Sequence, residues 1–241
     1  TKARVTEVQG FIGKYEVHIE TESGLTNIDI GVIIVATGAR TLVPQDLYNY
    51  DGEWVITQLE LEERLKEGLN KNVKNVVMIQ CVGSRNDERP YCSRICCNQA
   101  VKNSLRLKEL NPEARIDVLY PDMRCYGLTE LDYRRARLAG VNFIRFDPEK
   151  APAISASEDG IEVTVYDPSI QMDVQLNPDL LVLSTGVVPR DTEELATMLR
   201  VPRNDNGFFI EAHAKLRPVD LASEGIFMAG TAHGPKSVTE T

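Results

Sequence analysis

The alternation of apolar runs with helical segments between residues 73 and 146 is the feature that most restricts the fold of this chain. Apolar runs of strand length occupy 73–81, 115–119 and 141–146, and segments of helix length, 92–110 and 128–138, separate them. Strands that alternate with helices pair in parallel, because only a long crossover connection can return the chain in the same direction. The pattern therefore predicts an α/β fold with a doubly wound parallel sheet.

Two further segments predict β-meanders, and each leads into an apolar strand that ends in Thr-Gly. Alternating residues from 4 onward lead to the run 29–36, which we expect to be one strand buried on both faces, followed by Thr37 and Gly38. Residues 152–176 lead in the same way to the run 180–186. A helix from Thr57 to about Lys66, ending at Gly68, and a closing strand at 225–230 complete the expected elements.

The charge balance argues against nucleic acid as a partner. The chain has 27 Lys and Arg against 36 Asp and Glu, a formal net charge of −9, and an acidic protein repels phosphates unless a basic patch is concentrated somewhere. The best basic run, at 134–137, is short and resembles a solvated helix face. No apolar run approaches the ~18 residues of a membrane span, so we expect no direct membrane insertion.

The cysteines are clustered in a way that is atypical of secreted proteins. Five are present, and four of them, Cys81, Cys92, Cys96 and Cys97, fall within 17 residues. An odd count, this clustering and the absence of a signal peptide argue against a disulfide framework and favour the cytoplasm. The chain lacks an initiator Met, and residues 237–241 look like the first turn of a helix, so we expect it to be a piece of a longer protein.

The spacing of the four cysteines predicts that their sulfurs converge. Cys81 ends a strand at the carboxyl edge of the sheet, where doubly wound folds place ligands. Cys92 and Cys96 are four residues apart in the expected helix 92–110 and would share one face, with Cys97 next to them. The arrangement favours a [4Fe–4S] cluster, which needs four thiolates. A structural zinc site, a redox disulfide and plain buried thiols remain open, and we expect Cys125 to be an ordinary thiol.

Several motifs resemble a known group of proteins. The two strand–Thr-Gly units and the closing Gly225–Gly230 resemble the thioredoxin reductase-like, or pyridine nucleotide–disulfide oxidoreductase, flavoproteins. Gln80–Arg85, Tyr91–Cys97 and Gly234–Lys236 look more narrowly like the flavin and iron–sulfur subunits of heterodisulfide reductase. This resemblance implies an FAD- and iron–sulfur-containing electron-transfer protein that works with other subunits. It also implies that Cys81, Cys92, Cys96 and Cys97 hold a [4Fe–4S] cluster.

The resemblance also implies a domain organisation. Residues 1–48 and 201–241 would be two segments of a partial FAD-binding domain, and 49–200 an inserted, Rossmann-like, NAD(P)-binding-like domain that carries the cysteines. The Gly-x-Gly-x-x-Gly unit that holds the FAD pyrophosphate would lie upstream of Thr1, so we expect this chain alone to bind FAD poorly and to be inactive. After the strand 76–80 only Gly83 remains of a phosphate-binding turn. We therefore expect the NAD(P) pocket to be lost or repurposed.

The same resemblance points to residues on the flavin side. The turn Thr37-Gly38 would lie beside the FAD, although Thr-Gly can also be a simple strand exit. The family at large has Gly-Asp at the closing strand, where this sequence has Gly230-Thr231. Near the isoalloxazine would lie Gly234, Pro235 and Lys236. Lys236 could stabilise reduced flavin, or it could be a solvated lysine, and His233 is a weaker candidate for flavin proximity.

Three functions remain as hypotheses. The first is a fragment of a heterodisulfide reductase-like flavo-iron–sulfur protein that passes electrons between FAD and a [4Fe–4S] cluster. The second is an NAD(P)H-dependent disulfide oxidoreductase with Cys92 and Cys96 as its dithiol. The third is a non-catalytic docking module stabilised by zinc.

Overall fold

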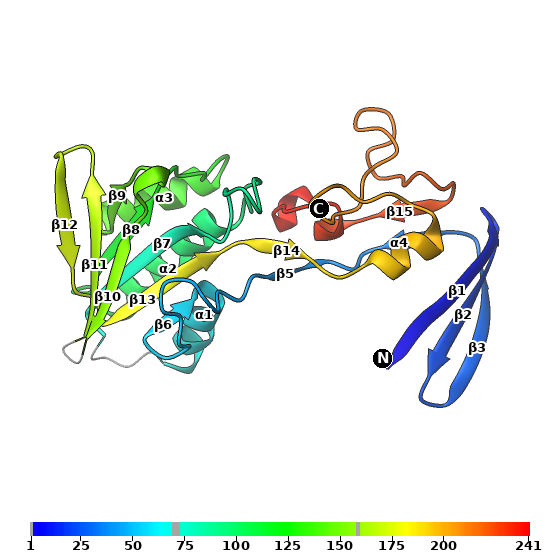
Figure 1. The fold of residues 1–241 in the computed structure, drawn as a ribbon, viewed down its shortest axis with the longest axis horizontal. Coiled ribbons are helices and arrows are strands. Elements are labelled where there is room, and N and C mark those ends of the chain that lie inside the picture. Colours follow the sequence, from blue (N-terminus) through cyan, green and yellow to red (C-terminus); the bar gives the residue numbers. More distant parts are fainter. Residues whose placement is uncertain (1, 69–72, 158–159) are drawn as a thin grey trace. The chain divides into compact units, whose positions relative to one another are not determined.

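The computed structural model describes residues 2–68, 73–157 and 160–241. Contacts between Cα atoms divide the chain into two compact units (Figure 1). Unit 1 comprises Thr1–Arg40 and Val187–Thr241, and unit 2 is the contiguous segment Thr41–Gly186. No helix within the described ranges is both long and apolar enough to cross a membrane.

Unit 2 is built on a parallel five-stranded sheet with the order β6-β13-β7-β8-β9. The strands are β6 (Val55–Thr57), β7 (Asn75–Val82), β8 (Arg115–Tyr120), β9 (Asn142–Arg145) and β13 (Leu180–Thr185). Every neighbouring pair runs parallel. This sheet confirms the α/β prediction. From β7 the chain moves on to β8 and β9 on one side, while β13 and β6 lie on the other. The carboxyl end of β7 is therefore the switch point, where such folds bind ligands.

Three helices pack on one face of this sheet. They are α1 (Gln58–Glu67), α2 (Cys96–Leu110) and α3 (Thr129–Leu138), and their apolar sides meet Val76, Met78 and Ile116 in one core. Helix α1 begins and ends where the sequence predicts. Its N-cap Thr57 accepts from the Glu60 amide, and the Glu60 carboxylate accepts from the Thr57 amide, which is a capping box.

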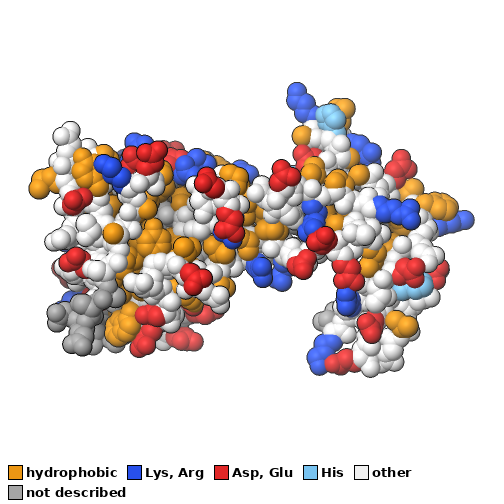
Figure 2. All heavy atoms as spheres, viewed as in Figure 1, with side chains coloured by type: hydrophobic (Ala, Val, Ile, Leu, Met, Phe, Trp, Pro, Cys, Tyr) orange, Lys and Arg blue, Asp and Glu red, His pale blue; other side chains and the backbone are white. Residues whose placement is uncertain are grey.

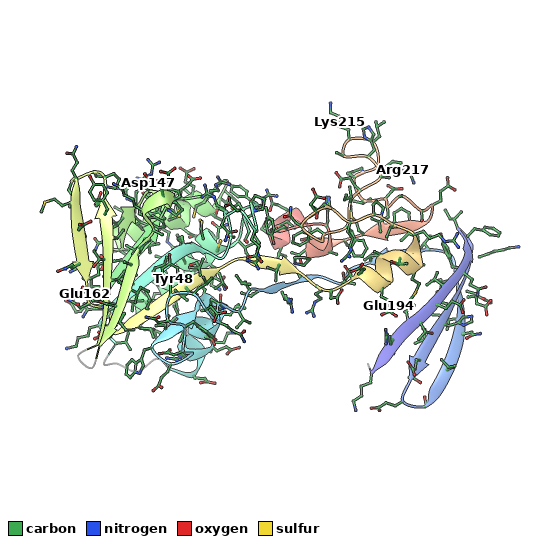
Figure 3. All side chains as sticks on the ribbon, in the orientation of Figure 1. Tyr48, Asp147, Glu162, Glu194, Lys215 and Arg217 are labelled. Atoms are coloured by element: carbon green, nitrogen blue, oxygen red, sulfur yellow. The ribbon has the colours of Figure 1, made fainter. Side chains whose placement is uncertain are left out.

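The opposite face of the sheet carries an antiparallel meander. Its strands are β10 (Ala153–Ser157), β11 (Gly160–Asp167) and β12 (Met172–Leu176), joined to β9 through a short 3₁₀ turn, η1 (Pro148–Lys150). Val163, Val165 and Leu176 pack against Val77 and Ile79 of β7 in a second core. Tyr48 also packs against this core (Figure 3), and burial raises the pKa of its phenol. The two cores form separate layers because alternate β7 side chains point to opposite faces.

A buried polar network crosses the helix-side layer next to β7. The Gln80 and Gln58 amide Nε2 atoms both donate to the Ser184 hydroxyl, at 2.8 and 3.1 Å, and Asn103 donates to Gln58 Oε1 at 2.7 Å. All four side chains are buried. Ser184 is the hub of this network, because two of the amides donate to its hydroxyl. A buried polar group that loses its partner is costly, so the network depends on this one side chain.

Unit 1 combines a β-meander with a pair of parallel strands. The meander is β1 (Ala3–Phe11), β2 (Lys14–Thr21) and β3 (Gly24–Ile30), and the parallel pair is β4 (Ile33–Val35) with β15 (Ile226–Met228). The remaining elements of unit 1 are α4 (Glu193–Leu199) and the 3₁₀ turns η2 (Gly230–Ala232) and η3 (Val238–Glu240). The two-stranded sheet of β5 (Ala39–Thr41) and β14 (Val187–Pro189) lies where the chain passes from one unit to the other, because Thr41 already belongs to unit 2. Glu194 of α4, labelled in Figure 3, pairs with Arg4 of β1.

The prediction of one doubly buried strand at 29–36 is wrong. The strand breaks at Gly31 and Val32, and Ile34 is 64% exposed. The reason lies in the pairing, because β3 pairs antiparallel with β2, whereas β4 pairs in parallel with β15. The chain must change sheets between them. An unbroken apolar run does not reveal such a change.

Charged side chains of both signs are interspersed on the visible face of each unit (Figure 2). Lys215 and Arg217 project from the loop that precedes β15 (Figure 3), and Arg217 pairs with Asp220 at its base. Arg135, in the run that the sequence singled out as basic, pairs with Asp132 one turn away.

Candidate functional site

Cys81 lies in a β-bulge at the carboxyl end of β7. Register with β13 shifts between the pairs Leu183–Ile79 and Thr185–Val82, which leaves one extra residue on β7. Cys81 has φ +63°, in the left-handed region that non-glycine residues rarely adopt. A bulge changes the direction in which a strand presents its side chains. Backbone strain of this kind is concentrated at functional sites, so Cys81 stays the candidate ligand that the sequence predicts.

Cys92, Cys96 and Cys97 lie where a loop enters α2. The predicted helix start at residue 92 is wrong, because α2 begins at Cys96. Arg94 has φ +61°, which a helix cannot accommodate, and the Arg94 amide donates to Cys92 Sγ at 3.3 Å. Cys92 and Cys96 therefore do not share a helix face. Cys92 lies on a short loop whose own backbone N–H faces its sulfur.

The four thiols nevertheless share one neighbourhood. Cys96 and Cys97 are buried and hydrogen-bonded to each other, and Cys81 and Cys92 are partly buried. Charge on Cys81, Cys92 or Cys97 raises the pKa of Cys96, and charge on Cys97 or Cys92 raises that of Cys81. Strand β7, the loop before α2 and the first turn of α2 thus bring four sulfurs within electrostatic reach of one another.

The surroundings of the thiols shift their pKa values in different directions. Burial is the main cause that raises the pKa of Cys81 to about 11, against the opposing effect of the Arg85 guanidinium. The hydrogen bond from the Cys96 thiol lowers the pKa of Cys97 to about 7, assisted by the Arg124 amide, and raises the pKa of Cys96 well above its ordinary value. Without a metal, Cys97 is the thiol that ionises most readily of these three.

Positive charge and N–H donors surround the sulfurs. Arg85 Nη1 lies 3.8 Å from Cys81 Sγ, and the Arg124 backbone amide donates to Cys97 Sγ at 3.4 Å. Asp122 connects the two arginines, at 3.6 Å from Arg85 Nη2 and 2.7 Å from Arg124 Nε. The first turn of α2 adds backbone N–H groups that lack partners within the helix. Such surroundings stabilise thiolates and thiolate-bound anionic groups.

Within the described part of the chain, no three His, Cys, Asp or Glu side chains have the spacing that one metal ion requires. The ligands of a cubane cluster bind different iron atoms, so they need not meet at a single point. Cys125 lies near this group but differs from it, because burial raises the pKa of its thiol to about 12.

The turn after β7 is packed against protein. A Cβ at Gly83, where φ is +68°, would lie 2.1 Å from Leu42 Cδ2. A Cβ at Gly186 would lie 3.0 Å from Ser84 Cβ and 3.3 Å from Ser93 Oγ. Close packing against neighbouring side chains therefore explains why both positions are glycine. Gly83 makes room for a leucine, where a dinucleotide-binding glycine makes room for a pyrophosphate.

A second group of predicted residues lies in unit 1, at the carboxyl ends of β4 and β15. Because these strands run parallel, the turn at Thr37 and Gly38 and the turn η2 follow them at the same edge. A Cβ at Gly38 would lie 3.8 Å from Thr231 Oγ1, so the two turns are adjacent. Thr37 Oγ1 is buried without a hydrogen-bond partner. A buried hydroxyl without a protein partner needs one from elsewhere, and a ligand or an ordered water at this edge would supply it.

Two residues that follow η2, His233 and Lys236, form a hydrogen-bonded chain with Glu211 of an earlier loop. Lys236 Nζ lies 2.9 Å from His233 Nδ1, and His233 Nε2 lies 2.8 Å from Glu211 Oε2. Gly234, between them, has open space where a Cβ would lie. Lys236 is therefore tethered through His233 and is not freely solvated. The bond to His233 argues against the alternative that Lys236 is simply a solvated lysine.

Sequence reasoning missed the arginines at the thiols and Glu211 at His233. Residues 122–125 follow β8, the strand next to β7, so they reach the same sheet edge as Cys81. The position of Arg124 near the thiols could have been predicted from this shared edge. Arg85 and Arg94 lie inside the cysteine motifs themselves. Glu211 had no signal, since it comes from an irregular loop far from His233 in sequence.

No family model matches this chain. It is similar to an iron–sulfur subunit of CoB–CoM heterodisulfide reductase from Methanopyrus kandleri, 36% identical over 248 residues, which covers 92% of this chain and 37% of the relative. It is also similar to one subunit of the ferredoxin:CoB–CoM heterodisulfide reductase of Methanosarcina acetivorans, 42% identical over 172 residues, covering 70% and 21%. The chain thus spans well under half the length of these relatives.

Solved structures with a similar fold include two thioredoxin reductases. That of T. acidophilum has a TM-score of 0.59 at 13% sequence identity, covering 97% of this chain and 66% of the other. That of Lactococcus lactis has a TM-score of 0.59 at 16% identity, covering 98% and 67%. Identities this low establish likeness of fold alone.

Proposed function

Over the segment it shares with its relatives, this chain belongs to the family of heterodisulfide reductase iron–sulfur subunits, and we propose from that premise that it is part of a flavo-iron–sulfur electron-transfer protein. Cys81, Cys92, Cys96 and Cys97 would hold a [4Fe–4S] cluster. The strand ends of unit 1 would form one wall of an FAD site. The observation that carries the proposal is the convergence of four thiols, two of which, Cys92 and Cys97, accept a backbone N–H, in a neighbourhood with two arginines.

The donor set fits a cluster chemically. Four thiolates are the usual ligands of a [4Fe–4S] centre, and hydrogen bonds to their sulfurs tune its potential. Cys92 and Cys97 each accept a backbone N–H, and Arg85 lies beside Cys81. The Methanopyrus kandleri relative is itself named an iron–sulfur subunit. The buried thiols Cys81 and Cys96 would lose their protons on ligation, which offsets the cost that burial imposes on a free thiolate.

The strand ends of unit 1 also offer groups that suit a flavin. The Thr37 hydroxyl lacks a partner, Gly38 and Gly230 have φ of +71° and +69°, and Lys236 offers a positive charge. Glycines allow a ligand to approach the backbone closely. The FAD-binding domain would be completed by parts of the whole protein outside this chain. NAD(P) is not part of the proposal, because Leu42 fills the space beside Gly83.

The bound cofactors would supply the electron transfer itself. The residues of this chain would hold them, exclude water and set their electrostatics. The Cys96–Cys97 pair is buried, Arg85 and Arg124 offset the negative charge of thiolates, and Asp122 keeps both guanidinium groups in place. The whole protein would exchange electrons with other subunits of a reductase complex, since both relatives are named as subunits of such complexes.

Metal analysis of the anaerobically purified chain tests the proposal. We expect about four iron atoms and equal acid-labile sulfide per chain, with broad visible absorption that reductant bleaches. Cys96→Ser should abolish most of this iron, whereas Cys125→Ser, a matched cysteine outside the set, should keep it. Zinc without sulfide would favour the docking module. Metal-free protein with a titratable Cys92–Cys96 dithiol would favour the NAD(P)H-dependent oxidoreductase.

A further inference from the structure

Glu211, His233 and Lys236 form a continuous hydrogen-bonded line in unit 1. The distance is 2.8 Å between Glu211 Oε2 and His233 Nε2, and 2.9 Å between His233 Nδ1 and Lys236 Nζ. The side chains of His233 and Glu211 are 31% and 21% exposed, so both are mostly covered by protein. Packing therefore limits the rotamers and hydrogen-bond partners that His233 and Glu211 can adopt.

The chemistry of the three groups fixes where the hydrogens lie. An ammonium has three N–H donors and no acceptor, so Nδ1 of His233 must accept from Lys236. A carboxylate only accepts, so Nε2 of His233 must carry the proton and donate it to Glu211. His233 is therefore neutral, in the Nε2–H tautomer. The pKa of Glu211 is lowered, first by its own backbone N–H and then by His233, which keeps the carboxylate charged.

Lys236 and His233 lie close in sequence to the edge of unit 1 that we propose binds the flavin. Lys236 and His233 follow β15 by way of η2, and η2 is adjacent to the turn after β4, where the Thr37 hydroxyl lacks a partner. A lysine side chain on its own samples many rotamers. The bond to His233 uses one ammonium N–H and leaves two for other acceptors.

We propose that Glu211 and His233 are positioning residues that hold the Lys236 ammonium at the flavin edge of unit 1, so that its charge favours the reduced, anionic flavin. The inference rests on the proposed function and deepens it. Glu211 fixes the tautomer of His233, and His233 fixes Lys236. The charge that acts on the flavin belongs to Lys236 alone, while the other two residues determine where it lies.

The first experiment needs no flavin. The chain has three histidines, so ¹⁵N-histidine labelling gives a simple long-range ¹H–¹⁵N spectrum, and His233→Gln identifies the His233 signals. We expect neutral His233 protonated at Nε2 at pH 7, and we expect Glu211→Leu to reduce that tautomer preference at least threefold. Glu211→Gln, which keeps an acceptor oxygen, should retain most of it. A His233 ring that is doubly protonated, or protonated at Nδ1, would overturn the inference.

The second experiment uses the full-length protein with its FAD. Lys236→Met should weaken the preference for reduced flavin about tenfold, which is about 30 mV for a two-electron couple. His233→Leu and Glu211→Leu should each cause about a threefold loss, and His233→Gln should restore part of it. Lys215→Met, a lysine on the projecting loop of the same unit, should have no effect.

The two experiments separate the possible failures. If Lys236→Met shifts the potential but the Glu211 and His233 variants do not, the positioning role is refuted and the proposed function stands. If the full-length protein contains no FAD, the proposed function fails on its flavin side and takes this inference with it. Thermal unfolding of each variant identifies those that do not fold. Comparing Glu211→Gln with Glu211→Leu then isolates the effect of an acceptor oxygen at position 211, because the two side chains are nearly equal in size.

Discussion

The backbone amide of Arg124 donates a hydrogen bond to the sulfur of Cys97 at 3.4 Å. The two residues come from different elements, the loop after β8 and the first turn of α2. A backbone donor cannot be removed by changing a side chain, so this contact depends only on the path of the 121–125 loop. Two adjacent parallel strands thus supply, at one sheet edge, both a ligand candidate on β7 and a donor for another ligand candidate.

Thiol ionisation in the metal-free chain should occur in separate steps. Cys97 has a pKa lowered to about 7 by its hydrogen bond with Cys96 and by the Arg124 amide, and Cys81 has one raised to about 11, chiefly by burial. Ultraviolet thiolate absorbance should therefore rise by about one equivalent through pH 7, and Cys97→Ser should remove that step. Because Cys97 loses its proton as pH rises, cluster reconstitution should be slower at pH 6 than at pH 8. An unchanged titration in Cys97→Ser would contradict this assignment.

Arg85→Gln should make the cluster harder to reduce. The guanidinium lies 3.8 Å from Cys81 Sγ, and reduction adds negative charge that it stabilises. We expect the midpoint potential to fall by on the order of 30–60 mV, a three- to tenfold effect for a one-electron couple. Potentiometric EPR measures it. Arg106→Gln, which alters an exposed arginine of α2 paired with Glu109, is the matched control and should leave the potential unchanged.

Ser184→Ala should destabilise the chain by about 2 kcal/mol or more. The substitution removes the acceptor of two buried amide donors, on Gln58 and Gln80, and each unsatisfied buried donor costs roughly 1–3 kcal/mol. Urea unfolding followed by circular dichroism measures the change. Ser155→Ala, in strand β10 outside this network, serves as the control. A loss below about 0.5 kcal/mol would mean that the glutamines find other partners.

Thr57→Ala should cost about 1 kcal/mol by removing the capping box of α1. The Thr57 hydroxyl accepts from the Glu60 amide, and nothing in alanine replaces it. Equilibrium urea unfolding again gives the value. Thr197→Ala provides the comparison, because Thr197 is an exposed residue inside α4 and alanine is the better helix former there. Equal losses in the two variants would show that the cap contributes little.

The parallel sheet and α1 could be predicted because each depends on local signals. Apolar runs of strand length alternate with helices in unit 2, and Thr57, Glu60 and Gly68 mark the ends of α1 in the sequence itself. The position of Cys81 at a sheet edge follows from the same pattern. Its bulge does not, because the extra residue in β7 is visible only against the register of β13.

The details of the site depend on contacts that single-sequence patterns do not encode. The helix start at Cys96 depends on the left-handed Arg94, a residue type that ordinarily suits a helix. The split between β3 and β4 depends on which strands they pair with. Glu211 reaches His233 through an irregular loop. In each case the deciding partner or conformation carries no periodic signal.

The pairing of β4 with β15 has a consequence for how the chain is made. Ile33 lies opposite Ile226, so the first of these strands leaves the ribosome long before its neighbour exists. Unit 2 is one uninterrupted segment and can complete its own sheet in that interval. The edge that carries Thr37 and Gly38 is therefore assembled last, and termination of synthesis between Gly186 and Ile226 would leave that edge unformed while unit 2, which holds the thiol group, is already complete.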